Sequence, residues 1–397
     1  MKELIYFEKE KLAHVGGPYG YLCNLYEELE KRNVTNIDFL ENSDSKVTHL
    51  LKKIKDNLPK EIKKIYLNYR NKKNHINYIK NAFNDKPKKT SLNINNYDVI
   101  HFHTTMSMYL IKDSLKDYKG KVVLTSHTPK APYKEYIEDK ISKKEYLKNK
   151  KLYDKLEEVD EYAFERADYI IFPCKEAEEP YFNTWEKYNK IRKKIEQKII
   201  YLPTGIPNIN TNIYDKKSLK SKYSLPQESI VISYVGRHNE VKGYDELKKI
   251  ATEVTKCNKN IHFIIGGKEG PLYRLENEQW HEIGWTNKPY EIIKCSDAFI
   301  LPNKETYFDL ILLEVIALEM PVILTKTGGN KFFSKYKKSG LLFYDYGNIE
   351  QAVKLINSIN SNKSIEYGKL NKQIFLENFT IEKFTDKYIE IINKICE

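Results

Sequence analysis

The chain has 397 residues, which is long for one hydrophobic core and suggests two domains. Its 41% hydrophobic and 31% charged residues exclude a disordered chain. The formal net charge of +12 suits nucleic acid, an anionic lipid surface or a phosphorylated ligand, and it does not choose among them, because a solvated lysine-rich surface explains much of it.

The N-terminus and the cysteines indicate the compartment. The first residues, MKELIYFEKEKLAHVGG, lack an apolar core of signal-peptide length, and no segment approaches the roughly 20 apolar residues of a membrane-spanning helix. The five cysteines are scattered and never form a C-x-x-C pair, which argues against a disulfide framework and a zinc site. We therefore expect a protein of the reducing cytoplasm.

The first predicted element is a helix that starts near Tyr21, after the glycines of HVGGPYGY. Backbone N–H groups at Gly16 and Gly17 could approach a phosphate or a sugar closely. A simple turn explains the same glycines, and the G-x-G-x-x-G fingerprint is absent. Both interpretations stay open at this point.

Residues 51–90 form the densest basic tract, with isoleucine and tyrosine interleaved at loosely helical spacing. Such a helix could lie on an anionic membrane. A packed helix with a solvated lysine face is the alternative, and we favour it.

Eight short apolar runs, most of them followed by helical patterns, predict the strands. Continuous Val, Ile, Leu and Phe runs of this length are typical of strands buried on both faces, as in parallel sheets. The runs are YDVIHFHTT, KVVLTSHTP, ADYIIFPCKEA, QKIIYLPTG, SIVISYVGRHN, IHFIIGGKEG, SDAFILPNKE and MPVILTKTGG. They predict an α/β fold with two parallel sheets, in which ligands bind at the carboxyl ends of the strands.

Histidines follow two of the early strands. His127 stands just beyond the run VVLTS, and His101 and His103 belong to the end of VIHFH. A histidine in such a place can hydrogen-bond a ligand hydroxyl or transfer a proton. Packing against the sheet is an equally good explanation for each of them.

The segment PTGIPNINTN has the composition of a linker, so we place the domain boundary near residues 205–212. The predicted domains are 1–207 and 208–378. The last segment, FTIEKFTDKYIEIINKICE, predicts an amphipathic helix, and we expect 379–397 to pack back on the first domain.

Two cations follow the first strand of the second domain. The segment SYVGRHNEVKGYDEL supplies Gly236, then Arg237 and Lys242 in a polar loop, then a helix. This arrangement can place two positive charges around a diphosphate. Without other signals, two surface cations would be the simpler explanation.

The segment NKETYFDLILLEVIALEMP carries four carboxylates in and around a buried helix. Asp309 is a suitable N-cap, and Pro321 stops the helix before the next strand. Glu314 lies in the second turn among Leu, Ile and Val, where a charge is costly unless it is paired or hydrogen-bonded. We therefore expect Glu314 to face a bound polyol.

Together these segments resemble the GT-B glycosyltransferases of the large retaining group called family 4, the glycosyl transferases of group 1. The likeness spans nearly the whole chain. It rests on GGPYGY, YDVIHFH, VVLTSHTP, ADYIIFPCKEA, YLPTGIPN, YVGRHNEVKG, FIIGGKEG, IGWT and NKETYFDLILLEVIALEMPVILTKTGG. The resemblance implies two Rossmann-like domains that face each other across a cleft, with an acceptor in the first domain and a nucleotide-sugar in the second.

The resemblance also implies roles in the second domain. Arg237 and Lys242 match the pair that neutralises the donor diphosphate, which needs no metal or cofactor. Glu314 matches the glutamate that binds the ribose hydroxyls. The resemblance also implies that Gly284 and Trp285 contact the base through the main chain, and that the backbone N–H groups of Leu310 and Ile311 meet the phosphate. Gly236 is a further donor-binding position.

In the first domain, His127 matches a histidine that contacts the donor sugar, while Gly16 and Gly17 match a loop that closes on sugar and phosphate. This chain departs from the family at the first of the two glutamates that the family carries. An ungapped alignment places Thr306 at that glutamate's position. A one-residue extension of the loop would still place Glu305 at the donor, and we prefer this explanation. Asp309 stands where the family usually has glycine, so its charge would face the diphosphate unless it turns away.

The expected activity is transfer of a hexose or N-acetylhexosamine, most readily from a UDP-sugar, to a hydroxyl of a surface glycan or a lipid-linked saccharide. The alternatives are a catalytically silent GT-B subunit that binds a partner or glycan, and a protein O-glycosyltransferase. We expect no nucleic acid partner. Homo- or hetero-oligomers, and peripheral contact with an anionic membrane at its inner face, stay open.

Overall fold

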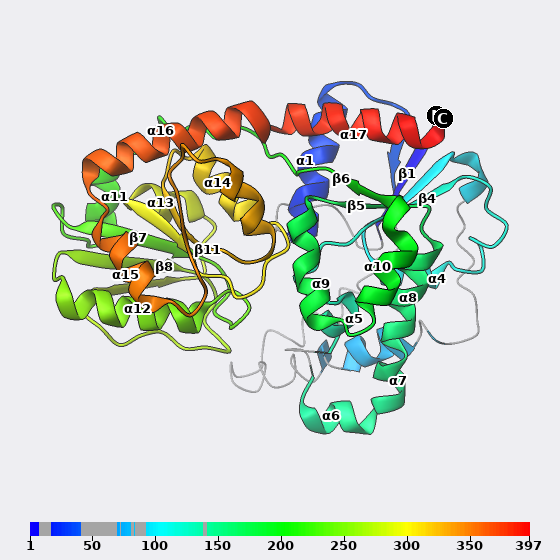
Figure 1. Ribbon diagram of the computed structural model, residues 1–397, viewed down its shortest axis with the longest axis horizontal. Coiled ribbons are helices and arrows are strands. Elements are labelled where there is room, and N and C mark those ends of the chain that lie inside the picture. The colour runs from blue at the N-terminus through cyan, green and yellow to red at the C-terminus, as the bar shows by residue number, and fades with distance from the viewer. Residues whose placement is uncertain (8–16, 41–69, 72, 81–82, 84–92, 138–140) are drawn as a thin grey trace, which may run out of the picture. The chain divides into compact units, whose positions relative to one another are not determined.

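The computed structural model describes residues 1–7, 17–40, 70–71, 73–80, 83, 93–137 and 141–397. The chain divides into two compact units (Figure 1). The first unit comprises Met1–Ile171, Thr184–Ile200 and Glu390–Glu397, and the second comprises Phe172–Asn183 and Tyr201–Ile389. The division falls after Ile200 rather than after 207, and it assigns only Glu390–Glu397 of the last helix to the first unit. Each unit contains one six-stranded sheet, so the predicted α/β class with two parallel sheets is confirmed.

The first sheet has the strand order β2-β1-β3-β4-β5-β6. Its strands are β1 Glu3–Tyr6, β2 Ile37–Phe39, β3 Val99–Phe102, β4 Lys121–Thr125, β5 Tyr169–Phe172 and β6 Ile199–Tyr201. The register places His101 beside Ile5 on one side and Val123 on the other. The ends of β3 and β4 therefore lie at the same edge of the sheet, which brings the residues that follow them together.

Short helices connect these strands. They are α1 Gly17–Lys31, α4 Thr105–Leu110, α5 Pro132–Glu135, α6 Lys143–Lys148, α7 Lys150–Asp154, α8 Leu156–Arg166, α9 Glu179–Thr184 and α10 Tyr188–Ile195. Helix α8 packs on α4, α5 and α10. Helix α1 begins at Gly17, earlier than the predicted start near Tyr21, and Gly16 lies outside the described residues.

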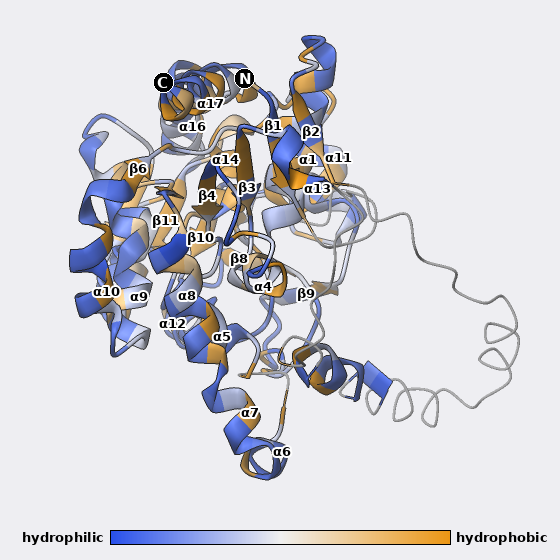
Figure 2. Ribbon diagram, turned by 90° about the vertical axis from the view of Figure 1, so that its right-hand side faces the viewer, coloured by the Kyte–Doolittle hydropathy of each residue, from blue (hydrophilic) through white to orange (hydrophobic). Residues whose placement is uncertain are grey.

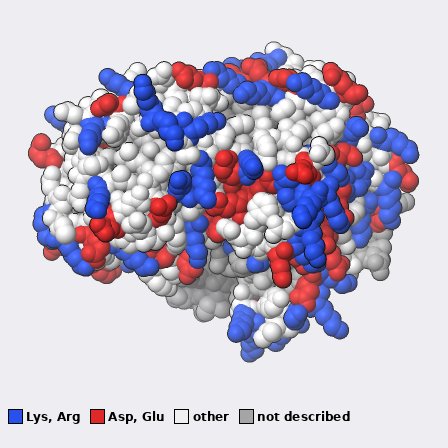
Figure 3. Space-filling model, in the orientation of Figure 1, with Lys and Arg blue, Asp and Glu red and all other residues white. Residues whose placement is uncertain are grey.

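Helix α10 shows how part of the positive charge is used. Lys187 pairs with Glu157 and Glu161 of α8, and Lys194 pairs with Glu165 at 2.6 Å. On the face drawn in Figure 3, basic and acidic side chains are interspersed in the same way along α17 (Ile381–Cys396). Lys187 and Lys194 are therefore paired with carboxylates and are not a free basic surface.

The basic tract 51–90 falls outside the described residues except for 70–71, 73–80 and 83.

The second sheet has the order β12-β11-β10-β7-β8-β9. Its strands are β7 Ile230–Val235, β8 Ile261–Gly266, β9 Trp280–Gly284, β10 Ala298–Leu301, β11 Val322–Thr325 and β12 Leu341–Tyr344. The helices are α11 Lys216–Lys222, α12 Tyr244–Cys257, α13 Pro289–Lys294, α14 Leu310–Ala317, α15 Ile349–Asn357, α16 Ser361–Asn378 and α17. Strands β10 and β7 are neighbours, so the loops that follow them, with Glu305 and Arg237, leave the same edge.

Alternation along the strands builds a core on each face of this sheet. Ile232 and Tyr234 face α12 and α15, whereas Val231 faces α11 and α13. Figure 2 accordingly shows β10 and β11 as hydrophobic, with polar residues on the helices outside. Because helices cover both faces of this sheet, its strands are continuous apolar runs in the sequence.

Two glycines let the site loops approach closely. Gly243, which precedes α12, has φ +65, and a Cβ atom there would lie 1.7 Å from the carbonyl oxygen of Pro302. A Cβ atom on Gly329 would lie 1.9 Å from the carbonyl oxygen of Tyr307. The loop after β10 is therefore held between backbone segments that only glycine admits.

Gly243→Ala should lower the free energy of unfolding by roughly 3 kcal/mol, because it adds a backbone clash to the cost of a positive φ. Gly347→Ala is the matched control, since Gly347 also has a positive φ, +87, but no atom lies within 4 Å of its Cβ position. We expect the control to lose only about 1 kcal/mol in urea unfolding. Equal losses would show that the contact with Pro302 is unimportant.

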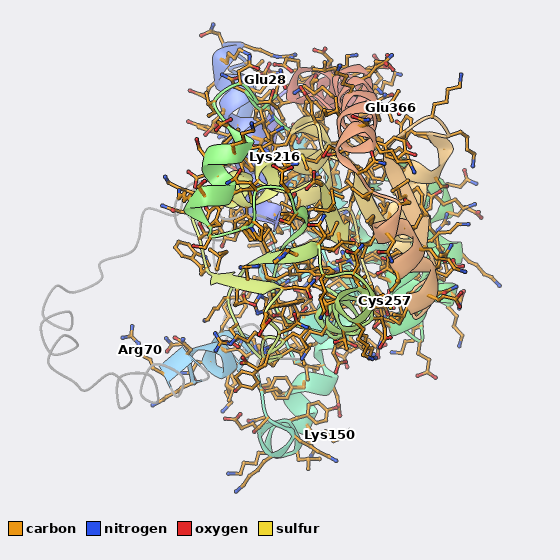
Figure 4. The ribbon with its side chains drawn as sticks, turned by 90° about the vertical axis from the view of Figure 1, so that its left-hand side faces the viewer. Glu28, Arg70, Lys150, Lys216, Cys257 and Glu366 are labelled. Carbon is orange, nitrogen blue, oxygen red and sulfur yellow. The ribbon has the colours of Figure 1, made fainter. Side chains whose placement is uncertain are left out.

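The cysteines are all free thiols, and Cys257 lies exposed at the end of α12 (Figure 4). Within the ranges given above, every helix is too short or too polar to span a bilayer. An ion pair with a buried carboxylate tethers α11, where Lys216 Nζ lies 2.5 Å from Asp297 Oδ1.

Candidate functional site

The loop after β7 presents Arg237 to solvent. The hydroxyl of Tyr234 donates to the Arg237 carbonyl at 2.8 Å, and the N–H of Gly236 donates to the Gly266 carbonyl at 3.0 Å. The backbone of Arg237 is thus anchored while its side chain is exposed. Its guanidinium makes no hydrogen bond or ion pair with any other described residue. It is therefore a cation available to an anionic ligand.

Lys242 has a different environment, because it is already paired. Its ammonium lies 2.7 Å from both carboxylate oxygens of Asp309, and the amide of Asn303 donates to the same carboxylate at 2.5 Å. Asp309 precedes α14, as predicted for an N-cap, but its side chain makes no capping hydrogen bond. The carboxylate turns to Lys242 instead. A ligand phosphate must compete with Asp309 for this ammonium.

Glu314 lies in the second turn of α14, half-buried, with a hydrogen bond from the Tyr290 side chain. Burial raises the pKa of Glu314 to about 7, while the bond from Tyr290 opposes that rise. The carboxyl group therefore changes charge near neutral pH, and its ionised form can accept hydrogen bonds from a pair of hydroxyls.

Glu305 and Thr306 differ in access. Thr306 is wholly buried, and its Oγ1 has no hydrogen-bond partner among the described residues. Its carbonyl accepts the N–H of Gly329 at 3.1 Å. Glu305 is only half-buried, and Asn183 donates to its carboxylate at 3.3 Å. Of the two, Glu305 has the accessible side chain, and its contact with a donor sugar stays a prediction.

The N-terminus of α14 lies beside these groups. Leu310 and Ile311 form its first turn, where backbone N–H groups have no intrahelical acceptor. They carry the positive end of the helix dipole. The Asp309 carboxylate at the same place reduces that positive potential.

The end of β9 presents Gly284 and Trp285. Gly284 has φ +75 and open space at its Cβ position, and the Trp285 side chain is 75% exposed. The carbonyl of Gly284 accepts the N–H of Gly267 at 2.8 Å. An indole ring and a bare main chain at a strand end offer a surface on which a planar base can stack.

Two residues near this edge escaped sequence reasoning. Tyr290 supports Glu314, and Asn303 supports Asp309. Asn303 lies two residues after the end of β10, and a polar residue so close to a strand end is a signal in the sequence. Tyr290 reaches Glu314 only through the packing of α13 against the sheet, so no local pattern identifies it.

In the first unit, His127 follows β4 and contacts His103, which follows β3. His103 Nδ1 lies 2.9 Å from His127 Nε2. Gly17 opens α1 with φ +56 and has open space at its Cβ position. These residues stand at the carboxyl edge of their own sheet, as the pattern predicts.

The described residues include no group of three or more His, Cys, Asp or Glu side chains that could hold a metal ion.

In the second unit, several of the predicted site residues lie at one edge of the sheet. They are Arg237, Lys242, Glu305, Glu314 and the first residues of α14.

Comparison with known proteins shows which proteins this chain resembles. Residues 215–375 match the family model described as glycosyl transferases group 1. The O-antigen biosynthesis glycosyltransferase WclY of Escherichia coli is 22% identical over 227 residues, which cover 53% of this chain and 62% of that protein. The UDP-Gal:alpha-D-GlcNAc-diphosphoundecaprenol alpha-1,3-galactosyltransferase of the same species is 26% identical over 223 residues, or 50% and 56% of the two chains.

Among solved structures, the sucrose-phosphate synthase from Thermosynechococcus elongatus superposes with a TM-score of 0.66 at 14% identity, covering 100% of this chain and 99% of that chain. This likeness confirms the GT-B fold. The matched segments span less than two thirds of the length of the two curated relatives. Together the matches confirm the resemblance to group 1 glycosyltransferases.

Proposed function

We propose that this chain, which carries the group 1 segment on a GT-B fold, is a retaining glycosyltransferase. It moves a hexose or N-acetylhexosamine from a UDP-sugar to a hydroxyl of a surface glycan or a lipid-linked saccharide at the inner face of the membrane. The observation that carries the proposal is an exposed Arg237, which pairs with no other described residue, at the same sheet edge as Glu314 and the start of α14. One relative is a galactosyltransferase named for a UDP-Gal donor and a GlcNAc-diphosphoundecaprenol acceptor, which supports the same donor and acceptor classes.

The chemistry follows from where charge develops. As the bond between the anomeric carbon and the diphosphate oxygen breaks, negative charge grows on the leaving group. Arg237 and the first N–H groups of α14 stabilise it. The acceptor hydroxyl attacks on the face that the diphosphate leaves, and its proton passes to a departing phosphate oxygen. The configuration is retained, and no protein nucleophile takes part.

Two side-chain cations and a helix N-terminus can replace a divalent ion at a diphosphate. Metal-independent activity is therefore part of the proposal. Turnover that survives a chelator would support it, and strict dependence on added Mg²⁺ or Mn²⁺ would contradict it.

One observation favours a second function. The Asp309 carboxylate holds Lys242 and adds negative charge where a diphosphate must bind. A GT-B subunit that binds a glycan or a partner without turnover has no diphosphate to bind, so the pair of Asp309 with Lys242 would not hinder it.

A screen of UDP-, GDP- and ADP-sugars for nucleotide release separates these functions. We expect release from a UDP-sugar, stimulated by a saccharide acceptor, and heat of binding with UDP alone. A protein that neither binds any of the three nucleotides in calorimetry nor releases them would support the silent subunit.

Asp309→Asn should tighten UDP binding by about tenfold, because it removes a charge that repels the diphosphate and competes for Lys242. The matched control is Asp345→Asn, which makes the same charge change at an exposed position. Calorimetric titration at two salt concentrations measures the effect. Weaker binding by Asp309→Asn would mean that Asp309 instead holds Lys242 in its working position.

A further inference from the structure

A pair of histidines at the carboxyl edge of the first sheet has a defined geometry. His103 is 1% exposed, and His127 is half-buried. Their rings are nearly parallel, at 17° and 5.2 Å between centroids, and Nδ1 of His103 lies 2.9 Å from Nε2 of His127. This is a direct hydrogen bond between two rings that the ends of neighbouring strands hold in place.

Both rings are neutral at physiological pH. Burial lowers the pKa of His103 well below its usual value and that of His127 to about 3. A neutral imidazole carries one proton, on either Nδ1 or Nε2. One ring must therefore donate to the other, and the direction decides which nitrogen of His127 carries its proton.

The environment of His103 sets that direction. Its Nε2 is buried and has no hydrogen-bond partner among the described residues. A buried N–H without an acceptor is among the rarest and most costly arrangements in proteins, and an unused lone pair costs less. The proton of His103 therefore lies on Nδ1, where it reaches His127 Nε2.

The ring behind His103 is also held. The ring centroids of His101 and His103 are 4.3 Å apart. His101 is itself held by two contacts, with Nε2 2.8 Å from Thr125 Oγ1 and Nδ1 3.4 Å from Glu3 Oε1. Tyr21 covers the other side, with its ring 5.6 Å from that of His103. His103 cannot turn without displacing these neighbours, so its donor stays aimed at His127.

We propose that His103 is a positioning residue that fixes His127 as its Nδ1–H tautomer, so that His127 meets the donor sugar as a hydrogen-bond donor. The part that concerns the sugar rests on the proposed function. With its Nε2 already accepting from His103 and its Nδ1 protonated, His127 has no basic nitrogen for the acceptor hydroxyl. It binds a sugar oxygen and does not act as the general base.

The tautomers can be measured without turnover. Long-range ¹H–¹⁵N correlation spectra of the full chain with ¹⁵N-labelled histidine distinguish protonated from bare ring nitrogens. His127→Gln and His103→Asn identify the two residues among the nine histidines. We expect His127 in the Nδ1–H form, which is the minor form of free histidine. A His127 ring protonated on Nε2 would overturn the proposal.

Two variants of His103 separate positioning from packing. His103→Asn places an amide N–H near the original Nδ1, whereas His103→Leu fills the space without a donor. We expect His127 to keep the Nδ1–H form with asparagine and to shift toward Nε2–H with leucine. An unchanged tautomer in His103→Leu would overturn the proposal, provided that its thermal midpoint shows a folded protein.

Kinetics then test the sugar contact. In His103→Leu the KM for the donor should rise about three- to tenfold, the loss expected for one hydrogen bond, with a smaller change in kcat. His103→Asn should restore most of it. Equal KM values in both variants would overturn the sugar contact. Absence of turnover in the wild type would instead refute the proposed function and leave the tautomer result standing.

Discussion

Arg237→Ala is expected to reduce donor turnover by about 10²–10³-fold, the loss typical of one group that stabilises charge in a transition state. Arg237 is exposed, unpaired within the described part of the chain, and anchored through its carbonyl by Tyr234. Lys242 cannot compensate, because Asp309 already holds its ammonium with two contacts of 2.7 Å. The free guanidinium is thus the main side-chain charge for a diphosphate.

Steady-state release of UDP from the donor measures this effect, and calorimetry with UDP separates binding from chemistry. Arg237→Lys should recover only part of the activity, since an ammonium cannot bind two phosphate oxygens in the fork geometry of arginine. Arg274→Ala serves as the matched control, because Arg274 is an exposed arginine of the same unit that pairs with Glu276 at 3.0 Å. A loss below about threefold in Arg237→Ala would rule out this role.

Glu314→Gln is expected to weaken UDP binding about tenfold at pH 8, where the wild-type carboxyl is ionised. Burial raises the pKa of Glu314 to about 7, so below that pH the group holds a proton and accepts fewer hydrogen bonds. Wild-type affinity for UDP should therefore increase between pH 6 and pH 8. The glutamine variant should show no such increase.

Stability should respond in the opposite direction. The folded pKa lies above the ordinary value of 4.5, so the folded protein binds this proton more tightly than the unfolded chain. The contribution of Glu314 to stability falls as pH rises from about 4.5 to about 7. Glu314→Gln should thus be no less stable than the wild type at pH 8 in urea unfolding, although it binds UDP less well.

Two controls isolate the ribose contact. Tyr290→Phe removes a hydrogen bond that favours the carboxylate, so the pH midpoint of UDP binding should move upward. The 2′-deoxy analogue of UDP should bind the wild type more weakly than UDP does, and bind Glu314→Gln about as well as UDP does. An equal preference for UDP over its analogue in both proteins would show that Glu314 does not contact the ribose.

Local pattern located most strands. All eight predicted runs are strands of the two sheets, because parallel strands with both faces covered are mostly apolar. The run of β6 was apolar enough to be found although it lies at a sheet edge and is only partly buried. Four strands were missed: β1, β2, β9 and β12. Three of them lie at sheet edges, where a short strand needs fewer apolar residues, and β1 begins with the buried Glu3. The buried carboxylate of Glu3 pairs with His101, which lies 98 positions later in the sequence. No local periodicity reveals such a pair.

The amino-acid sequence by itself determined the α/β class, the strand ends at which chemistry is expected, and the family resemblance, because burial and strand period act over a few neighbouring residues. Only the tertiary structure decided the partners of the charged and titratable groups. In the folded chain Asp309 pairs with Lys242, and His103 hydrogen-bonds His127. Thr306 is buried, whereas the side chain of Glu305 stays accessible. These outcomes depend on which loops the neighbouring strands bring together, and electrostatics at that range follows distance in space and not separation along the chain.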